Sequence, residues 1–262
     1  MAVAVDPASL AAGLEAWIAD RVAAARSRGA VVGVSGGVDS AVTAALCARA
    51  LPGRVTCLAL PCHTDPADLE RARLVVERFG LDLTVVTLDA AYDALVACLG
   101  VVQAGAACRV PGGGTAREAI RRVALANLKP RLRMTALYYF ANCRNHLVVG
   151  SSNRDELTVG YFTKYGDGGV DIAPIGGLTK GEVVALARHL GVPAAVIERP
   201  PSAGLYPGQT DEGELGFTYA MLDRYLLTSE APAEVRTLID QRIAASEHKR
   251  KPPPAFDPQA CR

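Results

Sequence analysis

Short apolar runs alternate with helix-length segments along most of this chain, and the alternation limits its possible folds more than any other feature. Four runs rich in valine and leucine predict buried strands at residues 30–34, 55–60, 83–88 and 146–150. Helices are predicted between and after them, at 8–27, 38–50, 66–79, 90–99, 116–143, 179–190, 218–227 and 231–246. Such alternation implies right-handed crossovers. We therefore expect an α/β fold with a doubly wound, mostly parallel sheet flanked by helices.

Composition indicates a globular protein with a large core, because 50% of the 262 residues are hydrophobic and 21% are charged. We expect one domain over residues 1–262, with an irregular tail from about residue 249. The formal net charge of +1 argues against a dedicated nucleic-acid-binding protein. No apolar run reaches the roughly 18 residues of a membrane span, and the N-terminus lacks the basic region of a secretory signal. These features favour a cytoplasmic protein.

Two features have no assigned role at this point. Seven cysteines are scattered through apolar segments and are expected to be reduced thiols that pack as small hydrophobes, at positions 47, 57, 62, 98, 108, 143 and 261. A metal or redox pair of Cys57 and Cys62 is the alternative, although no other Cys or His cluster completes such a site. Residues 100–114 end in three glycines and show little periodicity, which predicts a mobile loop.

The most informative motif is the hexapeptide Ser-Gly-Gly-Val-Asp-Ser at 35–40, between a predicted strand and a predicted helix. Adjacent glycines let the backbone approach an oxyanion, and a helix N-terminus attracts phosphate. Ser35 and Ser40 can add hydroxyl donors, and Asp39 can hold Mg²⁺. No lysine follows the glycines, so the motif is not a Walker A loop. The plainer interpretation is a tight turn in which Ser35 and Asp39 act as helix N-cap residues.

The complete hexapeptide resembles the pyrophosphate-binding loop of the N-type ATP pyrophosphatases, which cleave ATP between its α and β phosphates. The second half of the chain narrows the choice. The segments that carry the further resemblance are 127–134, 150–157, 160–171, 200–204, 211–216 and 247–250. Together they are similar to the NAD synthetases, and the similarity covers roughly residues 30 to 251. A glutaminase domain, which some of these enzymes carry, is not recognised, so free ammonia or a separate partner is the expected nitrogen source.

The resemblance implies an ATP- and Mg²⁺-dependent amidation of deamido-NAD with ammonia, through an adenylated intermediate, with release of AMP and pyrophosphate. It implies ATP contacts at Gly33, Val34, Ser35, Gly36, Gly37, Val38, Asp39, Ser40, Ser151, Lys180 and Ser202. It implies contacts to deamido-NAD at Arg131, Lys164, Asp171, His248 and Lys249. The implied Mg²⁺ ligands are Asp39 and Glu156. Many relatives have Thr where this chain has Ser151, which keeps the hydroxyl.

The residue types also suit this chemistry without the family. Attack of a carboxylate on the α-phosphorus joins two anions, so Mg²⁺, Lys164 and Lys180 would offset the charge that develops. Ammonium must lose a proton before it attacks the acyl carbon, and Asp167 is our candidate base, with Lys180 as the second catalytic residue. The alternative for Asp167, which lies between glycines, is a turn-forming role alone. A lysine at a helix start, as expected for Lys180, is unfavourable unless an anion binds there.

Two other functions remain open. The first is another N-type ATP pyrophosphatase, amidating or tRNA-thiolating, although thiolating enzymes usually show paired cysteines and tRNA favours a basic protein. The second is a non-catalytic nucleotide-binding module. Such a module has no need for Asp39, Glu156, Lys164 and Lys180 together, but fold alone would not separate it from an enzyme.

The predicted helix at 116–143 bears on quaternary structure. Its apolar residues cover more of the circumference than one core-facing stripe requires, and they are Val123, Leu128, Leu132, Ala136, Leu137, Tyr139 and Phe140. A twofold interface is the commonest way to bury such an excess. The resembled family is dimeric, with its dinucleotide bound at the subunit boundary, so we expect a homodimer. The alternative is a monomer whose C-terminal helices cover this helix.

Overall fold

The computed structural model of this chain describes residues 5–103, 114–206 and 208–257. Within them a sheet of four parallel strands runs in the order β3-β2-β1-β4. The strands are β1 (Gly29–Gly33), β2 (Val55–Ala59), β3 (Leu83–Val85) and β4 (His146–Val149). In register, Val31 lies between Thr56 on β2 and Val148 on β4. The predicted parallel sheet is confirmed.

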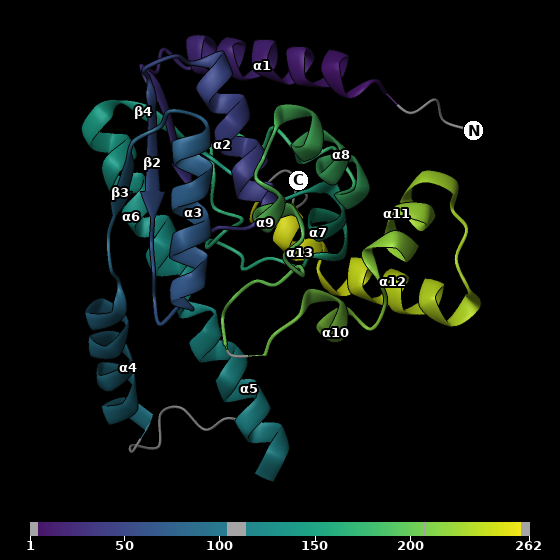
Figure 1. Cartoon of the computed structure of the whole chain (residues 1–262). Coiled ribbons are helices and arrows are strands. Elements are labelled where there is room, and N and C mark those ends of the chain that lie inside the picture. Colours follow the sequence, from purple (N-terminus) through teal and green to yellow (C-terminus); the bar gives the residue numbers. More distant parts are fainter. Residues whose placement is uncertain (1–4, 104–113, 207, 258–262) are drawn as a thin grey trace.

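Helices cover both faces of this sheet, as Figure 1 shows. Successive residues of β1 point to opposite faces, so Ala30 and Val32 join one core and Val31 joins the other. The first core is covered by α1 (Pro7–Ala24), α2 (Val38–Ala50), α3 (Pro66–Arg78) and α8 (Lys180–Leu190). The second is covered by α4 (Asp89–Gln103) and α6 (Leu128–Arg144). The doubly wound arrangement is therefore confirmed.

The single helix predicted at 116–143 is wrong, because the chain forms two helices that meet at Asn127. These are α5 (Gly114–Ala126) and α6. Pro130 explains the break, since its ring lacks an N–H and clashes with the carbonyl of the residue four positions earlier. The mobile loop predicted at 100–114 falls largely on residues 104–113, which lie outside the described residues; its two ends are helical, because α4 reaches Gln103 and α5 begins at Gly114.

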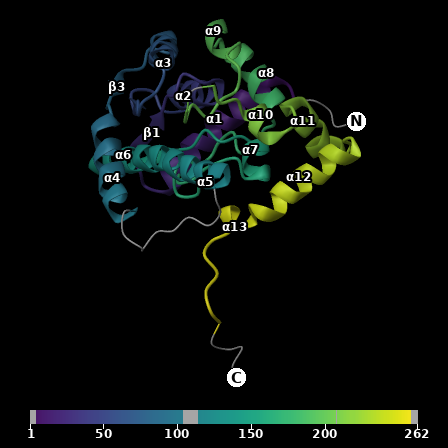
Figure 2. The ribbon, with the colours of Figure 1, turned by 90° about the horizontal axis from the view of Figure 1, so that it is seen from below.

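The C-terminal part adds a small third core, in which α11 (Tyr219–Thr228) and α12 (Ala233–Ala245) pack around Leu222 and Ile239. Four helices of at most six residues were not predicted, because they are too short to show a period: α7 (Arg154–Val159), α9 (Ala194–Ile197), α10 (Asp211–Leu215) and α13 (Glu247–Arg250). After α13, residues 251–257 form an exposed, irregular segment that leaves the body of the molecule (Figure 2).

Two further expectations can be compared with the described residues. Cys47, Cys57 and Cys62 are buried free thiols, which confirms for these three the expected packing as small hydrophobes, and burial raises the pKa of Cys57 to about 12. Cys98 and Cys143 are exposed, so the expectation is wrong for them, and Cys108 and Cys261 lie outside the described residues. No three His, Cys, Asp or Glu side chains gather as a metal-binding group in the part of the chain that the structure describes. No helix in these same ranges is long and apolar enough to cross a bilayer.

Candidate active site

A cavity of about 680 Å³ opens at the carboxyl ends of the strands. Its wall includes Gly33 at the end of β1 and Val34 after it, Leu60 after β2, and Gly150 and Ser151 after β4. Ligands of open α/β sheets bind in the crevice outside these strand ends. The cavity therefore lies where the fold itself favours a nucleotide site.

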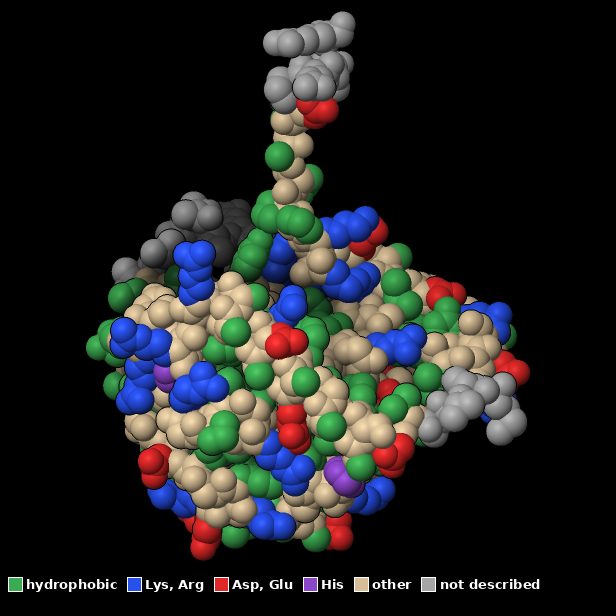
Figure 3. All heavy atoms as spheres, turned by 90° about the horizontal axis from the view of Figure 1, so that it is seen from above, with side chains coloured by type: hydrophobic (Ala, Val, Ile, Leu, Met, Phe, Trp, Pro, Cys, Tyr) green, Lys and Arg blue, Asp and Glu red, His purple; other side chains and the backbone are tan. Residues whose placement is uncertain are grey.

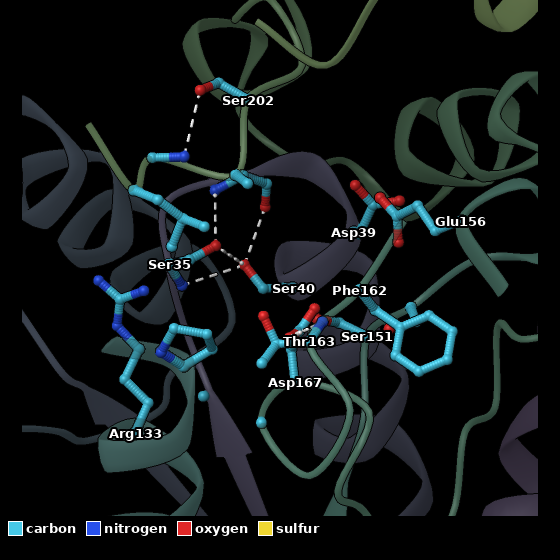
Figure 4. Close-up of a pocket in the computed structure, with 18 of the residues that line it drawn as sticks. Ser35, Asp39, Ser40, Arg133, Ser151, Glu156, Phe162, Thr163, Asp167 and Ser202 are labelled. Carbon is cyan, nitrogen blue, oxygen red and sulfur yellow. Dashed lines mark hydrogen bonds between the residues drawn. The ribbon is translucent and has the colours of Figure 1, made fainter. Parts of the chain in front are cut away.

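The hexapeptide 35–40 forms the turn from β1 into α2 at the edge of this cavity (Figure 4). Gly36 has a φ of 79°, and a Cβ there would lie 2.3 Å from the backbone oxygen of Asp68, so only glycine fits. Gly37 occupies the N-cap, and no described side chain caps it. The interpretation of Ser35 and Asp39 as N-cap residues is therefore wrong, and the start of α2 faces the cavity without a side-chain cap.

The two serine hydroxyls of this turn hold each other and the backbone. Ser40 Oγ accepts the Ser35 N–H at 3.1 Å and donates to the Gly37 oxygen at 3.0 Å. Ser35 Oγ accepts the Gly37 N–H at 3.3 Å and lies 3.1 Å from Ser40 Oγ. Two rotatable hydroxyls are thus fixed beside an uncapped helix N-terminus, which is an arrangement suited to an oxyanion.

Lys180 and Asp39 form a largely buried ion pair in the same cavity. Lys180 Nζ lies 2.5 Å from Asp39 Oδ2, and Asn153 Nδ2 donates to Asp39 Oδ1 at 3.0 Å. Lys180 is the first residue of α8, where the helix dipole disfavours a cation. Burial lowers the pKa of Lys180, but the charges of Asp39 and Glu156 raise it by more, so the pKa lies above its usual value. The lysine therefore stays charged because two carboxylates face it.

Glu156 lies beside Asp39 at the cavity wall (Figure 4). It is fixed by a capping box at the start of α7, in which Asn153 Oδ1 accepts the Glu156 N–H and Glu156 Oε2 accepts the Asn153 N–H at 3.2 Å. Burial and the charge of Asp39 raise the pKa of Glu156 well above its usual value. Two neighbouring carboxylates with one lysine form a group that a further cation would stabilise.

Asp167 faces the cavity near Ser151 and Thr163 (Figure 4). Its Oδ1 accepts the Thr163 N–H at 2.8 Å, within a turn that Gly166 and Gly168 close by donating to the Thr163 oxygen. Burial raises the pKa of Asp167, although the Thr163 N–H and the charges of Lys249 and Arg133 act in the opposite direction. The carboxyl thus shapes the turn and is also open to the cavity, so the geometry is compatible with both predicted roles.

The five residues implied to contact deamido-NAD differ in whether they reach the cavity. Lys249 lines the cavity and donates to the backbone oxygens of Gly160 at 2.6 Å and Phe162 at 2.8 Å. The other four are not among the described residues that line it. Three of these form a chain outside the cavity, in which Arg131 donates to the Lys164 oxygen at 3.4 Å and Lys164 donates to the His248 oxygen at 2.6 Å.

Asp171, the fourth, accepts the Tyr138 hydroxyl at 2.9 Å and the Val148 N–H at 2.8 Å, so it anchors β4 to α6. His248 and Arg131 are exposed. Figure 3 shows Lys and Arg side chains at the base of the C-terminal segment, where α13 places part of this basic group.

Ser151 and Ser202 line the cavity, and Ser202 Oγ donates to the Gln209 oxygen at 2.8 Å.

Three charged residues at the cavity were not singled out from the sequence. Arg133 donates to the Leu60 oxygen at 3.0 Å and to Thr64 Oγ1 at 3.1 Å. Asp211 accepts the Tyr219 hydroxyl at 3.0 Å, and burial raises its pKa. Arg199 pairs with Asp68 at 2.8 Å. The sequence shows the segment Asp211–Gly216 and the two prolines after Arg199, but it carries no signal that the Arg133, Asp211 and Arg199 side chains face the cavity. Their orientation follows from the tertiary structure.

Comparison with known proteins agrees with this geometry. The family described as NAD synthase matches residues 10–253. The NH(3)-dependent NAD(+) synthetase of Carboxydothermus hydrogenoformans is 47% identical over 237 residues, which cover 90% of this chain and 92% of that protein. The enzyme of the same name from Syntrophomonas wolfei is 44% identical over 250 residues, 95% of this chain and 96% of that protein.

Solved structures point the same way. An NMN synthetase from Francisella tularensis has a TM-score of 0.86 and 33% identity, covering 97% of this chain and 99% of its own. An NH3-dependent NAD synthetase from Campylobacter jejuni, in complex with the nitrate ion, has a TM-score of 0.75 and 28% identity, covering 97% and 100%. The family match over residues 10–253 and the relatives that are 44% and 47% identical lead to one conclusion: this chain belongs to the NAD synthase family.

Proposed function

We propose that this chain is a ligase that uses ATP and ammonia to convert deamido-NAD to NAD, with release of AMP and pyrophosphate. The observation that carries the proposal is the Lys180–Asp39–Glu156 group beside the uncapped start of α2, in one cavity at the carboxyl edge of the sheet. The identity of 47% to an NH(3)-dependent NAD(+) synthetase supports the substrate pair.

The phosphates of ATP bind at the turn from Gly33 to Ser40, where the α2 N-terminus, Ser35 and Ser40 supply donors. Lys180 neutralises charge on the transferred phosphorus, and Ser151 and Ser202 contact ATP from the walls of the same cavity. The carboxylate oxygen of the dinucleotide bonds to the α-phosphorus, and the bond from that phosphorus to the bridging oxygen breaks. Pyrophosphate leaves with the electron pair.

Asp39 and Glu156 would hold Mg²⁺. They fit this ion, because Mg²⁺ in nucleotide sites is usually bound by one or two carboxylates together with waters and substrate phosphates. Burial and the charge of Asp39 raise the pKa of Glu156, which accords with a site that a cation would stabilise. When bound, the ion would offset negative charge on the phosphates.

The second half-reaction joins ammonia to the acyl carbon of the adenylate, and AMP leaves with its oxygen. Asp167 accepts a proton from the attacking nitrogen, in agreement with its place at the cavity wall. The raised pKa of Asp167 makes it a better proton acceptor than an ordinary carboxylate while its charged form persists above that pKa. The loops at 160–170 and 199–210 line the cavity and would limit entry of water to the reactive adenylate.

Deamido-NAD would be contacted by Lys249 at the cavity wall and, outside the cavity, by Arg131, Lys164, Asp171 and His248. We propose that a second copy of the chain completes the part outside the cavity. Exposed apolar side chains on α5 and α6 support a homodimer, since Ile120, Val123 and Tyr139 are 49%, 54% and 65% exposed. Each copy would be one domain, and free thiols at all five described cysteines accord with a cytoplasmic location.

A second candidate is formation of NMN by the same amidation, starting from the mononucleotide carboxylate. The TM-score of 0.86 to an NMN synthetase favours it. Purified protein with ATP, Mg²⁺ and ammonium, given deamido-NAD or nicotinate mononucleotide in parallel, separates the two by kcat/KM. We expect NAD, AMP and pyrophosphate in equal amounts. ADP in place of AMP would refute adenylation, and a higher kcat/KM for the mononucleotide would establish the second candidate.

A further inference from the structure

Arg199 lies beside the turn at 35–40 that joins β1 to α2. It lines the cavity, and its Nη1 lies 3.5 Å from the position that a Cβ on Gly37 would take. Its side chain is 17% exposed. Gly37 is the residue at which α2 begins. The guanidinium therefore lies within reach of any oxyanion that the start of α2 binds.

Asp68 fixes this arginine from behind. The Arg199 Nη2 atom lies 2.8 Å from Asp68 Oδ1, and the same oxygen accepts Arg71 Nη2 at 2.5 Å. Asp68 is buried on α3, and its backbone oxygen lies against Gly36. The Arg199–Asp68 ion pair is therefore in direct contact with the turn at 35–40. The two arginines and the one carboxylate together carry a net charge of +1 next to the turn.

The two arginines differ in where that charge is available. Arg71 does not appear among the described residues that line the cavity, whereas Arg199 does. Asp68 is the charged partner of Arg199 in the described part of the chain, and the ion pair is made through Nη2, so it does not use Nη1. An arginine so held can donate two further N–H groups to a phosphate without losing its ion pair.

We propose that Arg199 is a catalytic residue that binds the departing pyrophosphate, and that Asp68 is the residue that positions it. The inference rests on the proposed function, because it assigns a contact within the same reaction. As the bond between the α-phosphorus and the bridging oxygen breaks, negative charge grows on the β-phosphate. The Arg199 N–H groups donate hydrogen bonds to the β-phosphate oxygens and stabilise this charge. Lys180 acts on the α-phosphate side, so the two cations divide the transferred and the leaving parts between them.

The test is rapid-quench measurement of pyrophosphate formation in a single turnover by wild-type protein, Arg199→Gln and Arg199→Lys, with deamido-NAD, ATP and Mg²⁺. Loss of one charge-stabilising donor at a reacting centre costs about 10²-fold or more in rate, and we expect that for Arg199→Gln. Arg199→Lys should recover part of the rate. Binding of inorganic pyrophosphate with Mg²⁺, followed by calorimetry, should weaken about 10-fold in Arg199→Gln, as expected for a lost charged contact.

Arg188→Gln is the matched control, because Arg188 is an exposed arginine in the last turn of α8, and its rate should equal that of the wild type. Asp68→Asn should slow pyrophosphate formation in the wild-type background but add nothing in Arg199→Gln, if Asp68 acts through Arg199. A wild-type rate and wild-type pyrophosphate affinity in Arg199→Gln would overturn the inference while the proposed function stands. Failure of the wild-type protein to form AMP and pyrophosphate would overturn the proposed function itself.

Discussion

The residues proposed to bind phosphate and those proposed to bind the dinucleotide are held in different ways. On the phosphate side, Ser35, Asp39 and Lys180 are held by hydrogen bonds and an ion pair to residues of the same sheet edge and its helices. On the proposed dinucleotide side, Arg131 and His248 are exposed; Arg131 donates to the Lys164 backbone oxygen, and the His248 backbone oxygen accepts from Lys164 Nζ. The difference supports the proposal that one chain preorganises the phosphate chemistry by itself. Recognition of deamido-NAD would then depend on a second copy of the chain that covers the exposed residues.

The largest effect is expected at the centre of the phosphate side. Lys180→Met removes the cation that faces Asp39 and Glu156, so both adenylation and the balance of buried charge are lost. We expect pyrophosphate formation to fall by about 10³-fold. Lys251→Met, at an exposed lysine of the C-terminal segment, is the control. If the two variants turned over at similar rates, the phosphate side would not be organised around Lys180.

Glu156→Gln should lower adenylation by about 10²-fold or more, because it removes a charge from the proposed Mg²⁺ site. Its effect on stability should have the opposite sign. The folded pKa of Glu156 lies above its ordinary value of 4.5, so the ionised carboxylate destabilises the fold increasingly as pH rises from that value toward the folded pKa. In metal-free protein at pH 8, thermal unfolding of Glu156→Gln should therefore occur at or above the wild-type temperature. A clear drop in that temperature, with unchanged Mg²⁺ dependence, would contradict the assignment.

Asp167→Asn separates the two half-reactions. Pyrophosphate should form at a near wild-type rate in a single turnover, while amide formation falls about 10²-fold, the usual contribution of a general base. Because the missing step is deprotonation of ammonium, raising the pH should partly restore the rate. In the wild type, the rate should fall as pH drops through the raised pKa of Asp167. Equal losses in both half-reactions would leave Asp167 with its turn at 163–168 as its only role.

Arg131→Ala should have the smallest effect and tests the dinucleotide side. We expect KM for deamido-NAD to rise about 10-fold while KM for ATP stays constant, as for one lost charged contact. Mixed dimers of Arg131→Ala and Asp39→Asn chains should show the wild-type KM for deamido-NAD if the two residues serve one site from different subunits. A KM that stays at the Arg131→Ala value in verified mixed dimers would place each whole site on a single chain.

The sequence predicts features that depend on local signals, and it does not predict contacts between segments that are far apart in the chain. Strands and the turn at 35–40 depend on local signals, namely β-branched runs and adjacent glycines. All four strands and the turn form where these signals predict them, although β3 ends at Val85 and not at residue 88. The helix break at Asn127 was also readable, because Pro130 stands three residues after it, but the apolar pattern continues across the break. Asn153 and Glu156 carry the spacing of a capping box, so α7 had a signal that periodicity could not supply.

Side chains that reach the cavity from a distance had no such signal. Arg199 becomes part of the phosphate side only because Asp68, far away in the sequence, lies beneath the turn. Arg133 is directed inward by the Leu60 oxygen at the end of β2. Contacts of this kind depend on how helices and strand ends meet, so the phosphate side is predicted by its motif and completed only by the fold.

Transfer of oxygen isotope tests the central claim most directly, because adenylation joins a substrate carboxylate oxygen to the α-phosphorus. Deamido-NAD labelled with ¹⁸O in its nicotinate carboxylate is turned over with unlabelled ATP and ammonium, and the products are analysed by mass spectrometry. The account predicts one ¹⁸O atom in each AMP and none in pyrophosphate. AMP without label, or label in inorganic phosphate, would contradict it.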